Sequence, residues 1–145
     1  MITSDQIITR LRQTVPVLGE IAGAIELAAL LDSKPQPRPK PMAHVVPMGL
    51  RGGAADAASG VFRQQVDVMF AVFVTIASVN DPKGARAIST VDGLLADIID
   101  ALAGWGPADA PGVLRLVRSA PQQFAPGALV YAVEFAIQDQ LRITQ

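Results

Sequence analysis

Few residues of this chain have side chains that could do chemistry. His44 is the only histidine, and as a general base it would need a carboxylate and a nucleophile close by. Asp97 and Asp100 are three residues apart, so on a helix their carboxylates could share one cation. The segment Arg51-Gly52-Gly53 loosely resembles a backbone nest that binds an anion. These residues are the candidates for acid–base chemistry, metal binding and anion binding.

Each candidate also has a plainer structural interpretation, which we favour. His44 stands among apolar neighbours in a short predicted strand, so we expect a strand or interface histidine. Asp97 and Asp100 fall on the polar side of a predicted helix, which indicates a solvated helix face. Residues 51–53 lack the preceding strand and following helix of a phosphate-binding loop, so we expect a flexible loop there.

Composition narrows the function classes further. The chain has no cysteine, which excludes disulfides, thiolate metal sites and a cysteine nucleophile. It contains no nucleophile elbow, phosphate loop or dinucleotide fingerprint. The formal net charge of −1 argues against a dedicated nucleic-acid binder. We therefore expect no cofactor, and an enzyme is the least favoured class.

Two very long runs with a period of two dominate the pattern, Val61–Ala77 and Ala128–Ile143. Such alternation places one set of side chains on one face of a sheet. At about 3.3 Å per residue, each run would reach about 50 Å, far beyond a usual strand. Strands of this length would project from a small core and invite pairing by neighbours. The alternating apolar positions, broken by Gln64 in the first run and by Asp139 in the second, are Phe62, Val66, Val68, Phe70, Val72, Val74 and Ile76, and Leu129, Tyr131, Val133, Phe135, Ile137, Leu141 and Ile143.

The polar ends of these runs carry the residues of interest for assembly. Arg63, Gln65 and Asp67 occupy the alternate positions at the start of the first run, before apolar residues replace them. Gln138 and Arg142 lie on the corresponding face near the end of the second run. Polar strand ends fit strands that leave the core and reach water, a partner or a lumen, and an ordinary solvated sheet edge is the alternative.

Two helices are indicated by caps and periodicity. Thr3 and Gln6 form a predicted capping box for a first helix that Pro16 stops. A broad apolar stripe predicts a second helix over 85–102, with Asp81 as N-cap, Pro82 in the first turn and Gly104 at the C-terminal cap. Between residues 17 and 31 we expect a short extended segment and then about two turns of helix. Trp105 is expected to cover the core rather than to form a binding platform.

The remaining segments complete the predicted order. The alternating prolines of 34–41 predict a stiff, extended connector. Met42–Met48 reads as a short strand, in which Pro47 indicates an edge or a strand end. Gly49–Gly60 reads as a long flexible loop. Val113–Arg118 reads as a strand, and a loop is expected from Pro121 to Gly127.

The predicted fold is a single α+β domain spanning residues 1–145. It has an antiparallel-rich sheet of about four strands with two main helices packed on one face. No stretch is long and apolar enough to span a membrane, and the N-terminus lacks the features of a signal peptide. We therefore expect a soluble, cytoplasmic protein with no membrane partner.

This order of elements resembles the tail terminator proteins of long-tailed bacteriophages and prophages. The resemblance covers almost the whole chain and rests on order rather than on a catalytic motif. It is carried by the capped first helix, the segment Ala24-Ile25-Glu26-Leu27-Ala28-Ala29-Leu30, the strand Ala43-His44-Val45-Val46-Pro47-Met48-Gly49, the Gly/Ala-rich loop, the strand Arg63–Ser78, the helix Ala85–Leu102 ending in Gly104-Trp105, and the strand Leu129–Ile143.

The resemblance implies a small structural subunit that forms a ring, commonly of six copies. Such a ring caps the tail tube in the virion tail, ends its polymerisation and offers the surface for the head connector. Its partners would be other copies, the tail tube protein and the connector or neck protein, with DNA only as passing cargo and assembly in the host cytoplasm. Arg51, Arg63 and Arg142 are our candidates for ring or lumen contacts, and the resemblance does not assign them.

Three other functions compete with a tail terminator. A head-completion or neck adaptor protein also forms rings and joins tails, and the sequence separates the two poorly. A monomeric α/β domain that binds a small ligand or peptide belongs to a different class. An enzyme would need convergent titratable groups that the sequence does not place together.

Overall fold

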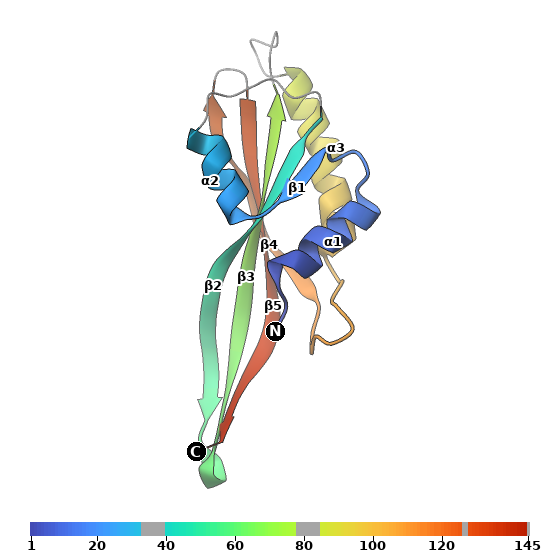
Figure 1. The fold of residues 1–145 in the computed structure, drawn as a ribbon. Coiled ribbons are helices and arrows are strands. Elements are labelled where there is room, and N and C mark those ends of the chain that lie inside the picture. Colours follow the sequence, from blue (N-terminus) through green and yellow to red (C-terminus); the bar gives the residue numbers. More distant parts are fainter. Residues whose placement is uncertain (33–39, 78–84, 126–127, 145) are drawn as a thin grey trace.

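The computed structural model describes residues 1–32, 40–77, 85–125 and 128–144. Within these ranges five strands form one open sheet in the order β1-β2-β3-β5-β4 (Figure 1). Strands β1 and β2 are parallel, and all other neighbours are antiparallel. The predicted α+β class and the antiparallel-rich sheet are confirmed, with β1 as a short additional strand. The elements are α1 (Ser4–Thr14), β1 (Glu20–Ala22), α2 (Ala24–Asp32), β2 (Met42–Asp56), a 3-10 turn (Ala58–Gly60), β3 (Val61–Ala77), α3 (Ala85–Leu102), β4 (Leu114–Ala125) and β5 (Ala128–Thr144).

The two long predicted strands are confirmed and pair with each other. Strand β3 occupies the predicted range, and β5 runs one residue further than predicted, to Thr144. Their antiparallel ladder is continuous from Val61 opposite Thr144 to Ala77 opposite Ala128. At about 3.3 Å per residue, a strand of this length reaches about 55 Å. Together with β2 they extend well past α1 and α3 (Figure 1).

The core lies between one face of the sheet and the helices α1 and α3. The alternation in β3 and β5 places Val72 opposite Val133 and Phe70 opposite Phe135, all of them buried. Burying a side chain of this size contributes about 1.5–3 kcal/mol. The helices close the core with Ile7, Ile8 and Leu11 of α1 and with Val91, Leu94, Leu95, Ile98, Ala101 and Leu102 of α3. The second face of the sheet therefore points away from α1 and α3.

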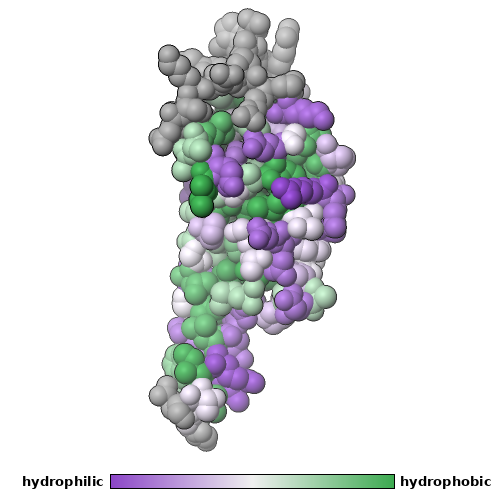
Figure 2. Space-filling view, viewed as in Figure 1, coloured by the Kyte–Doolittle hydropathy of each residue, from purple (hydrophilic) through white to green (hydrophobic). Residues whose placement is uncertain are grey.

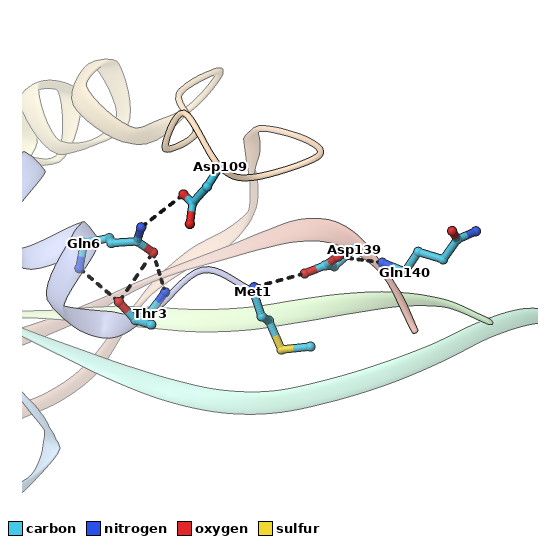
Figure 3. A network of polar contacts seen from close by, with 6 residues as sticks. All are labelled: Met1, Thr3, Gln6, Asp109, Asp139 and Gln140. Atoms are coloured by element: carbon cyan, nitrogen blue, oxygen red, sulfur yellow. Dashed lines mark hydrogen bonds and ion pairs between the residues drawn. The ribbon is translucent and has the colours of Figure 1, made fainter. Parts of the chain in front are cut away.

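The N-terminal segment is held by a small polar network (Figure 3). The predicted capping box is confirmed: the Gln6 backbone N–H donates to the Thr3 hydroxyl at 3.3 Å, and the Thr3 N–H donates to the Gln6 side chain at 2.9 Å. The Gln6 amide also donates to Asp109 at 3.3 Å, and the terminal ammonium of Met1 lies 3.9 Å from Asp139. These contacts attach the start of the chain to β5 and to the loop before β4.

The smaller helical predictions are also confirmed. The extended segment between α1 and α2 is β1, and α2 is the connection between the parallel strands β1 and β2. Gly104 follows α3 with a φ of 80°, as its cap position requires. Trp105 packs against the core, with the Arg10 guanidinium 5.4 Å from its ring centre, so it does cover the core. The predicted cap residues Asp81 and Pro82 lie outside the described residues, as does most of the 34–41 connector.

Two predicted boundaries are wrong. Strand β2 continues to Asp56, where we expected a loop from Gly49 to Gly60. A bulge between Pro47 and Gly49, with a φ of 96° at Gly49, lets the strand bend and resume its pairing with β3. The predicted loop after Pro121 is wrong in the same way, because β4 runs to Ala125. As an edge strand, β4 tolerates a proline that a central strand would not.

Candidate assembly surfaces

The residues singled out for chemistry do not form a chemical site in the described part of the chain. His44 is buried in β2, and both Asp97 and Asp100 are exposed on α3. The segment 51–53 is neither a nest nor a loop, because it pairs with β3 as part of β2. Among the described residues, no three His, Cys, Asp or Glu side chains are grouped so that they could hold a metal ion.

An open cleft of about 500 Å³ lies between α1, the start of α2 and the edge of β2. Its charged lining residues are Asp5, Arg12 and Glu26. Two of these side chains already form hydrogen bonds with nearby backbone groups. Arg12 donates to the Ile21 carbonyl and Glu26 accepts from the Gly23 N–H, both at 3.1 Å. The cleft therefore offers little convergent polar chemistry for a small ligand.

The part of the sheet that extends past the helices has two chemically different faces. We call it the distal ribbon and define it as residues 50–56 of β2, 61–68 of β3 and 137–144 of β5. On the face continuous with the core, Leu50 is 54% exposed and Ile143 is 48% exposed. Phe62 lies directly opposite Ile143 on this same face. Figure 2 shows hydrophobic and hydrophilic side chains side by side along the ribbon.

The other face of the ribbon is rich in arginine, with Asp56 and Asp67 among the arginines. Arg51, Arg63 and Arg142, our candidates for ring or lumen contacts, all lie on it and are all exposed. The register fixes this placement, because Arg63 is opposite both Asp56 and Arg142, and Arg51 is opposite Asp67. Directly opposite residues share a face of a sheet. The structure thus brings the three candidates to one surface, and their contacts with ring neighbours or a lumen remain a prediction.

Two arginines of β4 extend this surface. The Arg115 guanidinium reaches across β5 to Asp67 of β3, and Arg118 pairs with Glu134 of β5, each at 2.9 Å. Their side chains remain 53% and 64% exposed, respectively. Ion pairs this exposed contribute only about 0–1 kcal/mol to stability, so both guanidinium groups can still bind a further carboxylate. We call the five residues Arg51, Arg63, Arg115, Arg118 and Arg142 the arginine face.

The outer side of α3 carries charge of the opposite sign. Asp92, Asp97 and Asp100 are exposed, whereas Ile98 and Leu102 are buried against the sheet. No Lys or Arg occurs in α3 between residues 89 and 102, the part whose side chains are described. We call these three carboxylates the aspartate face. Because α3 covers the core side of the sheet, the arginine face and the aspartate face lie on opposite sides of the sheet, and the ribbon that carries Arg51, Arg63 and Arg142 extends beyond α3 along the strands (Figure 1).

The sheet has two open edges in the described part of the chain. Strand β1 pairs only with Met42–His44, so β2 from Val45 to Asp56 has no described strand on that side. Strand β4 is the other edge. Each edge has a proline, Pro47 or Pro121, near a break in its register. Prolines and bulges on edges hinder indiscriminate strand pairing.

Comparison with known proteins identifies a family. A family model described as phage tail terminator protein matches residues 1–145, the whole chain. No curated protein matches the chain. Among the described helices, none has both the length and the apolar character required to cross a membrane.

Proposed function

The chain belongs to the phage tail terminator family, and from this premise we propose that it forms a ring of six copies that caps the tail tube. Members of this family are structural proteins of the bacteriophage tail. In our proposal the ring ends polymerisation of the tube and then offers the surface to which the head connector or neck protein joins. The ring assembles in the host cytoplasm, remains in the virion tail, and lets DNA pass through its centre.

The match of the family to residues 1–145 is the observation that carries this proposal. The geometry supports the proposal. The described part of the sheet has two open edges, and the distal ribbon projects past the helices, so both can contact neighbouring subunits. A head-to-tail ring requires two different patches on each copy. The edges of β2 and β4 are such a pair, and so are the two charged faces.

The direct test is electron microscopy of lysates from the parent phage with this gene deleted. A terminator that halts tube growth predicts overlong or ragged tails without attached heads. Expression of the intact gene from a plasmid should restore tails of normal length, which serves as the control. Tail lengths should be measured across many particles, because a change in the length distribution is the specific signature of lost termination.

Other outcomes would contradict the proposal. Tails of normal length beside unjoined or leaking heads would assign the chain to the neck as a head-completion protein. Normal infectious particles would exclude both roles and return attention to a binding domain. In that case the cleft beside Asp5 and Arg12 is the place to examine first.

A further inference from the structure

We propose that, in the assembled ring, the arginine face of one copy docks on the aspartate face of the next. The inference rests on the proposed ring and goes beyond it by naming the surface, the occupant and the chemistry of the contact. The occupant is a second copy of this chain, because the two complementary surfaces belong to one molecule and lie on opposite sides of its sheet.

The charge distribution disfavours a two-fold dimer, which is the simplest alternative arrangement. A two-fold dimer through the aspartate face would place aspartates against aspartates, which costs free energy. A two-fold dimer through the arginine face would bring together two surfaces of net positive charge, although Asp56, Asp67 and Glu134 on that face reduce the repulsion. A face-to-back arrangement instead places opposite charges together at every contact and leaves one surface of each kind unsatisfied at the ends. Such a contact repeats from copy to copy, and it forms the proposed ring when the rotation between neighbours closes.

The described side chains suit a contact of this kind. Arginine presents a planar fork of donors that binds a carboxylate with two hydrogen bonds. Between the aspartates, the outer side of α3 carries the small residues Gly93 and Ala96, and a Cβ added at Gly93 would meet nothing within 4 Å. Small residues let long arginine side chains approach the helix closely. The apolar side of the distal ribbon is left for other contacts.

The test is a charge-reversal cycle in the full-length chain, followed by sedimentation velocity. One variant carries Arg63→Glu and Arg142→Glu, a second carries Asp92→Arg and Asp97→Arg, and a third carries all four changes. Each reversed pair alone should weaken self-association by about tenfold or more, because like charges then meet at every contact. The third variant should restore association to near the original level. A control with Asp5→Arg alone, on α1, should associate like the original chain.

The outcomes separate this inference from the proposed ring. If the original chain forms rings and the four-fold variant stays as weak as either pair, the docking of these faces is excluded while the ring stands. If both reversed pairs associate normally, the docking is again excluded. If instead the original chain fails to cap tubes and shows no self-association at any concentration, the proposed function itself fails. Circular dichroism of each variant checks that the changed surface residues leave the fold intact.

The absence of cysteine offers a second measurement on the same question. Cysteines introduced as Arg142→Cys and Asp97→Cys in one chain should form disulfides between copies on mild oxidation, giving a ladder of linked subunits. The matched control combines Arg142→Cys with Gln13→Cys, which places the second thiol on α1. A ladder from the control equal to that of the test pair would contradict the proposed docking.

Discussion

Arg63 of β3 and Arg142 of β5 lie directly opposite each other in the antiparallel ladder of the distal ribbon. Like charges in directly opposite positions destabilise a sheet, although Asp56 of β2, opposite Arg63 on its other side, offsets part of this cost. The pair is therefore unfavourable for the isolated molecule. That cost is consistent with a surface whose positive charge is used by a partner rather than by the fold.

Changing Arg142 to Glu should therefore have opposite effects on folding and on assembly. The new cross-strand pair with Arg63 should stabilise the monomer by about 0.2–1 kcal/mol. Self-association should weaken, because the arginine face loses a positive charge and gains a negative one. Urea denaturation of dilute protein measures the first effect, and sedimentation velocity measures the second. A variant that gains stability and still associates normally would show that Arg142 is not part of the contact.

The capping box at the start of α1 gives a prediction about stability alone. Replacing Thr3 with Ala removes the hydroxyl that accepts the Gln6 N–H, and should lower the free energy of unfolding by about 1 kcal/mol. Thr14→Ala is the matched control at the other end of α1. Its hydroxyl donates to the Arg10 carbonyl within the helix, so we expect a change within about 0.5 kcal/mol. Equal losses for the two variants would argue against a capping role.

The sequence predicted the parts of the fold whose own residues determine them. Strands β3 and β5 have apolar residues at nearly every second position along their length, and α1 has both halves of its capping box. The second half of β2 could not be predicted in this way, since Gly49–Asp56 is rich in Gly and Ala, residues depleted in strands. It is a strand because β3 lies beside it and pairs with its backbone.

The candidate surfaces, too, could be predicted from the sequence only in part. Arg51, Arg63 and Arg142 were identified from sequence, but their common face depends on the register between β2, β3 and β5. Arg115 and Arg118 were missed, because their ion pairs depend on how β4 meets β5. A break in register between Leu116 and Arg118 brings both arginines to the same face, and no local pattern signals that break.

Residues of the core and of the distal ribbon should respond differently to truncation. Phe135 is 1% exposed at the centre of the sheet, so Phe135→Ala should cost about 3–5 kcal/mol of stability. Ile143 is 48% exposed on the ribbon, so Ile143→Ala should change the free energy of unfolding by only about 0.5 kcal/mol. Urea denaturation of dilute protein compares the two variants. A large loss at Ile143 would mean that the ribbon contributes to the stability of the monomer as much as the core does.

Two glycines offer a matched pair of Gly→Ala substitutions with opposite signs. Gly49 has a φ of 96° at the bulge in β2, and a side chain there is strained although its Cβ would meet no other atom within 4 Å. Gly49→Ala should therefore destabilise the monomer by about 1–2 kcal/mol. Gly93 lies inside α3 with open space around its Cβ position, so Gly93→Ala should stabilise the monomer by about 0.5–1 kcal/mol.

Thermal unfolding monitored by circular dichroism compares these two variants directly with the original chain. The melting temperature should fall for Gly49→Ala and rise for Gly93→Ala, because only Gly49 has a backbone conformation that L-residues avoid. A lower melting temperature for both variants would mean that the methyl group added at Gly93 disturbs a contact that the isolated molecule does not show. No loss at Gly49 would mean that the bulge relaxes, and that β2 does not need a glycine to continue from the core into the distal ribbon.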